Sequence, residues 1–394
     1  MDSTHWIGAR EATARLGVKP QTLYAYVSRG VLSRRSRDGR TSEFDAAEVD
    51  RLASRARVGR RARAGTIDVA IATSISRISD DGVWFRGRPL SDLVGRACFE
   101  RVAEWLWRGV DEQCTPWRAP DALPMTSLGP QATATDVLVS CAGVVASNDA
   151  DRGDLSPDAL AAKGRALIAA FARSVPATRP RRPIDDSIAA ALLARLVGRR
   201  ATAPEVAAID AVLVILSDHD LASSTLAARV AASTRADAYA VVTAGLSSGA
   251  GPLHLSATTA TVRLLDEVRR AGDAPSVLDA YLRCGELIPG FGHRVYTGLD
   301  PRLPLVLDIV RAVPGAAERL AIVDDVIAAA AVRFDKQANI DLALGGMVHA
   351  LGLARHSTDY MFAIARTVGW LAHAIEEYQE RPLRFRPRAV YVGP

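Results

Sequence analysis

Three of the seven histidines lie in settings that favour chemistry. His219 lies in LSDHD at the end of an apolar run, His254 follows a Gly-Ala-Gly-Pro turn, and His293 is embedded in IPGFGHRVY. An imidazole exchanges protons near neutral pH, and glycine lets the backbone approach a ligand closely. Each histidine alone is equally compatible with a structural role. The combination of the three is what predicts a site.

The segments that carry these histidines are predicted to be helical. From about Thr66 to the end, stretches such as LSPDALAAKGRALIAAFARSV repeat helical periodicity, with Gly, Pro or Asp between them. Alternating strand patterns are scarce, apart from a small hairpin predicted near ISRISDDGVWFRG, with a turn at Asp81-Gly82. The Pro/Arg-rich stretch 173–183 is predicted to be an exposed loop.

The first sixty residues are predicted to form a separate module. REATARLG gives a first helix, Val18-Lys19-Pro20 breaks it, and QTLYAYVSRGVL gives a second helix that stops at Gly30. A basic segment with a hairpin tip at Asp38-Gly39 follows, and then a third helix from about Asp45 to Arg57. This spacing resembles the winged helix-turn-helix of MerR-type regulators and excisionase-like proteins.

That resemblance implies contact with DNA, through the second helix in the major groove and the wing on phosphates. The residues predicted to bind DNA are Gln21, Thr22, Tyr24, Arg34, Arg35, Arg37 and Arg40. Residues 1–64 hold 14 Lys and Arg against 7 Asp and Glu, so the positive charge of the chain is concentrated there. The alternative is a module that packs or contacts protein.

The composition is that of an ordinary globular protein. With 394 residues, of which 49% are hydrophobic and 24% charged, two or three domains are expected. No apolar run approaches a membrane span, and the N-terminus lacks the apolar core of a signal peptide, so a cytoplasmic location is expected. The four cysteines, Cys98, Cys114, Cys141 and Cys284, form no CxxC pair. We therefore predict neither a disulfide framework nor a zinc site, and four buried thiols instead.

Five motifs occur in an order and spacing that resemble those of citrate synthases. They are SDHDLASSTLAARVAAST, GAGPLHLSATTATVRLLDEV, IPGFGHRVYTGLDPRLPL, NIDLALGG and ARTVGWLAHAIEEYQERPLRFRPRAVYVG. The resemblance covers roughly residues 66–394. It implies an all-α citrate synthase fold with a large domain (65–255 and 352–394) and a small domain (256–351), following the N-terminal winged helix-turn-helix module and linker (1–64). It also implies a homodimer.

The resemblance implies a role for each site residue. Asp341 would be the base that removes a proton from the acyl thioester, His254 a neutral donor to the enolate oxygen, and His293 the proton donor to the ketone of oxaloacetate. His254 is expected at a helix start, where the helix dipole disfavours imidazolium. The structural alternative for Asp341 is a helix cap, since residues 339–341 could begin a helix.

The remaining implied residues bind the substrates. Guanidinium groups orient carboxylates by paired hydrogen bonds. The implied oxaloacetate ligands are His219, Arg302, Arg366 and Arg386, the last reaching across the dimer interface. For the arginines the alternative is a surface ion pair. The implied coenzyme A contacts are Ile288, Pro289, Gly290, Phe291 and Gly292. A coenzyme A thioester is the expected co-substrate; no metal and no tightly bound cofactor are expected.

The sequence departs from the family at a few positions. Leu255, Ser256, Ala257 and Thr258 replace the Gly-Gly-Ala-Asn that commonly follows the central histidine, Ala222 replaces an asparagine, and Thr297 replaces a basic residue. Bulk at Leu255 is expected to narrow the space for the thioester. The leading interpretation is condensation of acetyl-CoA or propionyl-CoA with oxaloacetate to give citrate or 2-methylcitrate. The alternative is a DNA-binding regulator that senses a metabolite without turnover.

Overall fold

The computed structural model describes residues 5–16, 18–28, 30–36, 41–50, 70–79, 82–118, 128–177, 187–387 and 391. The chain divides into two compact units, Met1–Ala72 with Pro387–Pro394, and Thr73–Arg386. No helix in the described ranges is long and apolar enough to cross a membrane.

The first unit contains β1 (Trp6–Gly8), α1 (Ala9–Leu16), α2 (Pro20–Ser28), β2 (Arg34–Ser36) and β3 (Ser42–Asp45). Its antiparallel sheet has the order β1-β3-β2. Leu23 and Phe44 are completely buried in its small core. Both predicted helices are present, and β2 pairs with β3 as expected for a hairpin. Residues 46–50 are helical; the hairpin tip and the rest of the predicted third helix and linker lie outside the described residues.

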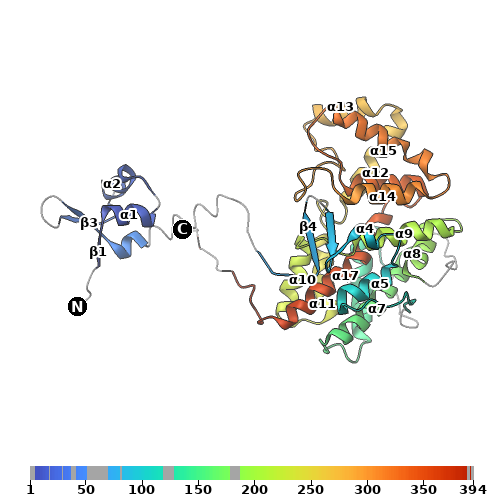
Figure 1. The fold of residues 1–394 in the computed structure, drawn as a ribbon, viewed down its shortest axis with the longest axis horizontal. Helices are drawn as coiled ribbons and strands as arrows, with labels where there is room; N and C mark the ends of the chain where they lie inside the picture. The colour runs from blue at the N-terminus through green and yellow to red at the C-terminus, as the bar shows by residue number, and fades with distance from the viewer. Residues whose placement is uncertain are drawn as a thin grey trace. The chain divides into compact units, whose positions relative to one another are not determined.

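The second unit begins with a small sheet and continues as helices (Figure 1). The sheet β4-β5-β6 comprises Ser76–Ser79, Gly82–Phe85 and Arg88–Pro89. The helices are α4 (Leu90–Leu93), α5 (Phe99–Arg108), α6 (Ala134–Ser147), α7 (Pro157–Ser174), α8 (Ile188–Leu196), α9 (Ala203–Leu216), α10 (Ser223–Ser233), α11 (Ala238–Gly249), α12 (Ala257–Ala271), α13 (Ala274–Arg283), α14 (Arg302–Arg311), α15 (Ala316–Ala331), α16 (Ile340–Leu351) and α17 (Ser357–Gln379). The predicted helical class and the β4–β5 hairpin are confirmed.

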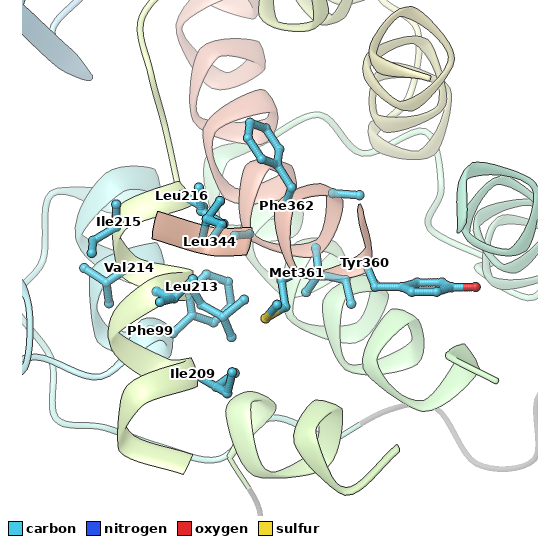
Figure 2. Close-up of a cluster of buried hydrophobic side chains, with 14 of the residues drawn as sticks. Phe99, Ile209, Leu213, Val214, Ile215, Leu216, Leu344, Tyr360, Met361 and Phe362 are labelled. Atoms are coloured by element: carbon cyan, nitrogen blue, oxygen red, sulfur yellow. The ribbon is translucent and has the colours of Figure 1, made fainter. Parts of the chain in front are cut away.

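Helix α17 is the centre of the main core. It is buried over nearly its whole length and contacts α5, α6, α7, α9, α10 and α11. A helix that is apolar on most faces is stable only when other elements surround it. Figure 2 shows Met361 and Phe362 of α17 near Leu213 of α9 and Leu344 of α16. The core therefore joins three of the helices that border the predicted site.

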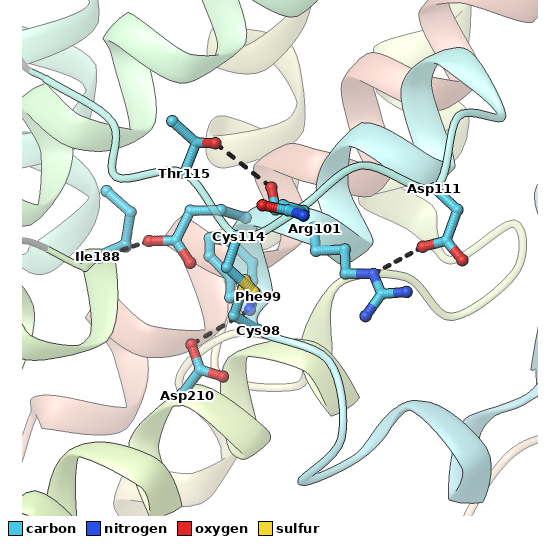
Figure 3. The surroundings of a disulfide bond; sticks show 10 residues. Cys98, Phe99, Arg101, Asp111, Cys114, Thr115, Ile188 and Asp210 are labelled. Carbon is cyan, nitrogen blue, oxygen red and sulfur yellow. Dashed lines mark hydrogen bonds and ion pairs between the residues drawn. A yellow bond between two sulfur atoms is a disulfide. The ribbon is translucent and has the colours of Figure 1, made fainter.

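The cysteine prediction is wrong at three positions. Cys98 and Cys114 form a disulfide, with Cα atoms 6.1 Å apart (Figure 3), and Cys284 is exposed. Cys98 is the N-cap of α5, and the segment after α5 returns to it across 16 residues. Sequence spacing does not reveal such a return, because the distance between the two Cα atoms depends on the tertiary path. Cys141 is buried, as predicted.

Candidate active site

The loop that carries His293 is fastened to the start of α16. Gly290 and Gly292 adopt φ of +83° and +79°, a conformation that glycine tolerates best. The Gly292 amide donates to the Gln337 carbonyl at 2.8 Å, and the Asn339 amide donates to the Gly290 carbonyl at 2.9 Å. These backbone bonds place His293 beside the N-terminus of α16.

His293 is oriented by the backbone that follows it. Its Nδ1 accepts hydrogen bonds from the Val295 amide at 3.0 Å and the Tyr296 amide at 3.3 Å. Burial and then the Arg302 charge lower the pKa of His293, so the neutral ring is favoured. With Nδ1 accepting, the neutral ring carries its proton on Nε2. That atom lies 3.5 Å from Arg302 Nη2, where a substrate oxygen could accept from both.

A buried carboxylate fixes Arg302. Asp300 accepts from Arg302 Nε at 3.0 Å and from Nη2 at 2.8 Å, and it also accepts from the Ile340 amide at 3.1 Å. Burial is the largest single effect and raises the pKa of Asp300, but the Arg302 charge and the hydrogen bonds from Arg302 and Ile340 together lower it more, so the net shift is downward. Asp300 therefore joins the start of α14 to the start of α16 and holds one guanidinium in place.

His219 lies among the other predicted groups. Its Nε2 is 2.9 Å from the Tyr296 hydroxyl, and its ring centroid is 5.4 Å from that of His293. Burial lowers the pKa of His219 far below its ordinary value, and the charges of Arg302 and Arg366 lower it further. His293 and His254 add to this effect, so these groups lie within electrostatic reach of His219.

His254 lies in the turn between α11 and α12. Its Nε2 is 2.8 Å from the Ser224 hydroxyl. Burial, followed by the Arg366 charge, lowers the pKa of His254 to about 4, so the ring is neutral at pH 7. The expected helix start was wrong, because α12 begins at Ala257. The neutral state was expected from a helix dipole, but burial is its main cause.

Asp341 is the second residue of α16. Asn339 is the N-cap, and its side chain accepts from the Asp341 amide at 2.9 Å. The Thr258 hydroxyl donates to Asp341 Oδ1 at 2.6 Å. Burial raises the pKa of Asp341, while Thr258 and the Arg302 charge act in the opposite direction. Asp341 is thus not the helix cap, and its carboxylate takes part in side-chain contacts around the site.

Arg366 is buried in α17 and retains donor capacity. Its Nε donates to the Leu216 carbonyl at 2.9 Å, while Nη2 has no hydrogen-bond partner among the described residues. Burial lowers the pKa of Arg366 to about 10. A Cβ on Gly369 would meet Asp218 and the Ser217 carbonyl, so this glycine allows α17 to approach the turn that carries His219. A buried guanidinium with an unused donor suits a bound carboxylate.

The surroundings of Arg386, of the segment 288–292 and of Leu255 bear on three further expectations. Arg386 is exposed and makes no hydrogen bond or ion pair within the described part of the chain. In the segment 288–292, expected to contact coenzyme A, the Gly292 amide and the carbonyls of Gly290 and Gly292 form hydrogen bonds with residues 337–339. Leu255 is 3% exposed and packs over Gly249, so its bulk enters the core, and the neighbouring Leu253 is 94% exposed.

The predicted DNA contacts lie in the first unit. Gln21, Thr22 and Tyr24 are exposed on α2. Arg34 stacks 5.8 Å from the Tyr24 ring centroid, and Arg35 forms an ion pair with Glu43 at 2.7 Å and stacks on Trp6. Arg37 and Arg40 lie outside the described residues.

Several residues of the site were missed by sequence reasoning. They are Asp218, Ser224, Thr258, Tyr296 and Asp300, and each contacts or adjoins a predicted group. All five lie within the motifs that resemble those of citrate synthases, so motif membership was an available signal. The sequence gave no signal for which partner each of them contacts. Among the described residues no group of three or more His, Cys, Asp or Glu could hold a metal ion.

Comparison with known proteins identifies the family. Residues 66–388 match the family model described as "Citrate synthase, C-terminal domain". Citrate synthase 2 of Bacillus subtilis is 30% identical over 360 residues, covering 83% of this chain and 94% of the relative. A 2-methylcitrate synthase of Corynebacterium glutamicum is 26% identical over 82% of this chain and 93% of its own length.

Solved structures agree with the sequence comparison. Citrate synthase of Thermoplasma acidophilum, in ternary complex with carboxymethyl coenzyme A and oxaloacetate, superposes with a TM-score of 0.70 at 26% identity. The match covers 83% of this chain and 95% of the archaeal chain. Citrate synthase of Thermotoga maritima gives a TM-score of 0.66. The chain belongs to the citrate synthase family.

Proposed function

We propose that this protein condenses an acyl-CoA, acetyl-CoA or propionyl-CoA, with oxaloacetate to give citrate or 2-methylcitrate and free coenzyme A. One observation carries the proposal: the neutral imidazoles of His254 and His293 and the carboxylate of Asp341 lie close enough to a buried arginine to feel its charge. Arg366 acts on His254, and Arg302 acts on His293 and Asp341. This set supplies an acid, a base and ligands for a dicarboxylate.

The first step is removal of a proton from the carbon next to the thioester carbonyl. Asp341 accepts that proton, and its raised pKa brings its basicity closer to what the step requires. The enolate oxygen that forms needs a donor. When the Ser224 hydroxyl donates to His254 Nε2, the neutral ring carries its proton on Nδ1, and this N–H stabilises the enolate.

The second step forms the carbon–carbon bond. The enolate carbon attacks the ketone carbon of oxaloacetate, and the ketone oxygen receives the proton from His293 Nε2. Arg302 and Arg366 bind the carboxylates of oxaloacetate, and His219 binds beside them. Water then cleaves the thioester, which yields the carboxylate product and the thiol of coenzyme A.

The proposal also includes a homodimer and the closure of two domains. We place Arg386 of one protomer in the site of the other within a homodimer, which fits its exposure and its lack of partners within the described chain. The large and small domains, bounded at residues 255/256 and 351/352, close over the substrates and exclude water until condensation is complete. The segment 288–292 then contacts coenzyme A.

The test follows thiol release from acetyl-CoA and from propionyl-CoA when oxaloacetate is added. We expect oxaloacetate-dependent release, reduced about 10²- to 10⁴-fold in kcat by Asp341→Asn. Asp335→Asn is the matched control, because Asp335 carries an exposed carboxylate outside the motif NIDLALGG. Undiminished turnover in Asp341→Asn would remove the proposed base. The ratio of the two kcat/KM values identifies the preferred acyl group.

We also propose that the N-terminal unit is a winged helix-turn-helix module that binds DNA. The exposed side chains of α2 and the cationic strand β2 support this, because a helix can enter the major groove while arginines meet phosphates. The similarity to active enzymes favours a chain that combines DNA binding with turnover over one that only senses a metabolite.

A gel-shift assay with genomic fragments tests DNA binding by the full chain. We expect a sequence-preferring shift that weakens steeply with salt and is lost in Gln21→Ala/Thr22→Ala. A shift that does not discriminate between fragments, or none at all, would leave the module as a protein-contact unit.

A further inference from the structure

A cavity of about 560 Å³ lies away from the proposed active site. Its walls come from the later turns of α12 and α16, the first turns of α15 and the segment 352–355. Thr258 and Asp341 lie at the starts of α12 and α16. Asp266 and His349, which line the cavity, each follow one of these residues by eight positions, about 12 Å along the helix.

The rim of the cavity is positively charged. Arg269, Arg319 and Arg355 line it, against the two carboxylates of Asp266 and Glu318. Asp266 is 2.5 Å from Arg355 and 3.6 Å from Arg269. Two guanidinium groups thus share one carboxylate, and for Arg319 no ion pair occurs among the described residues. The surplus charge favours an anion.

One polar atom on the wall lacks a hydrogen bond. His349 Nε2 is buried and lies 3.4 Å from Asp266 Oδ1, but it has no hydrogen-bond partner among the described residues. A buried polar atom without a partner is uncommon, because leaving it unpaired costs free energy. A ligand in the cavity could supply the missing partner.

The cavity also has an apolar surface. Val262, Ile322, Val348 and Leu353 line it, and Val262 is 3% exposed. The volume lies within the range of sites for small organic molecules, about 300–1,000 Å³, and exceeds what an inorganic anion fills. Arginines beside an apolar surface match a ligand that joins an acidic group to a ring or alkyl body.

We propose that this cavity binds a small organic anion with an apolar body and that its occupancy changes turnover. Binding would link α15 to α12 and α16, whose first turns hold Thr258 and Asp341. It would also engage the segment 352–355, at the proposed boundary of the small domain, and so bias domain closure. The effect on turnover rests on the proposed function, whereas the binding does not.

Calorimetric titration of the full chain with anilinonaphthalene sulfonate tests the binding, because this probe joins one sulfonate to an apolar ring system. We expect saturable binding, weakened about tenfold or more in Arg269→Gln and Arg319→Gln. Arg270→Gln is the matched control, because Arg270 is the exposed neighbour of Arg269 and does not line the cavity. Coenzyme A and oxaloacetate should not displace the probe.

Equal weakening in Arg270→Gln, displacement by coenzyme A or the absence of saturable binding would overturn the site. The second measurement compares the KM for oxaloacetate with and without the probe. We expect a shift in the wild type and none in Arg319→Gln. An unchanged KM in an active, probe-saturated enzyme would overturn the regulatory role, and a chain without turnover would instead refute the proposed function.

Discussion

The two halves of the candidate site are held in different ways. On the proposed oxaloacetate side, His293 is fixed by two backbone amides and Arg302 by a buried carboxylate that also binds α16. On the proposed thioester side, His254 and Asp341 each bind a single hydroxyl, from Ser224 and Thr258. Removing one member of a buried charge pair costs much of the free energy of unfolding, because the other charge is left buried and unpaired. A hydroxyl, by contrast, can be removed with little change in packing.

This difference predicts where a substitution lowers activity without lowering the free energy of unfolding. Changes on the oxaloacetate side should reduce both, because the groups that position the substrate also hold α14 against α16. Changes on the thioester side should reduce activity alone. The following variants would break this comparison or make it more exact.

The largest effect is expected for Asp300→Asn. It leaves Arg302 buried without its counter-charge, which costs about 3–5 kcal/mol of the free energy of unfolding. Denaturant unfolding measures this cost. Asp308→Asn, on the helix α14 that Arg302 begins, removes an exposed carboxylate 3.5 Å from Arg311 and should cost less than about 1 kcal/mol. Similar losses in the two variants would show that the Asp300 pair does not hold the site.

The next effect is expected for Thr258→Val. Removing the hydroxyl that donates to Asp341 should lower kcat about tenfold, or ~1.4 kcal/mol, with little change in the midpoint of thermal unfolding. Because the bond lowers the pKa of Asp341, its loss should move the acidic limb of the kcat profile to higher pH. Thr258→Ser should restore the wild-type profile.

Thr259→Val is the matched control for Thr258. Thr259 lies on the same helix, but its hydroxyl donates to Asp359 at 3.2 Å. Its removal should leave the pH profile in place. A similar shift in both variants would mean that the hydroxyl of Thr258 acts through the helix rather than through Asp341.

A smaller effect is expected for Ser224→Ala. The ring of His254 loses the partner of Nε2 and with it the preference for one tautomer, so kcat should fall about three- to fivefold. The KM for oxaloacetate should stay constant, because the groups around Arg302 are untouched. Ser223→Ala, an exposed neighbour, should match the wild type. A raised KM for oxaloacetate would contradict the separation of the two halves.

The smallest effect concerns the pH dependence of stability. The pKa of His254 is about 4 in the folded chain, below the ordinary value of about 6.5. Folding therefore favours the neutral ring, and this contribution is complete above pH 6.5 and lost as pH falls toward 4. His254→Gln should unfold with a weaker pH dependence across that window. An identical slope in the variant would show that His254 titrates normally.

The sequence by itself determined the helical class, the N-terminal helices, the β4–β5 hairpin and the family. These follow from local periodicity, turn residues and ordered motifs, all of which are properties of neighbouring residues. The motifs also named the histidines, Asp341 and the arginines that lie around His219. The roles of those residues and the two-domain boundary stay predictions.

Only the tertiary structure decided which neighbouring groups keep the site residues in place. The Thr258–Asp341 bond, the bond from the Ile340 amide to Asp300 and the Cys98–Cys114 disulfide each join residues whose spacing in the sequence gave no sign of contact. The burial of Leu255 and the neutral state of His254 also depend on what packs around them. Local patterns specify helices and residue types, but the distance between side chains and the water around them are set when the helices pack.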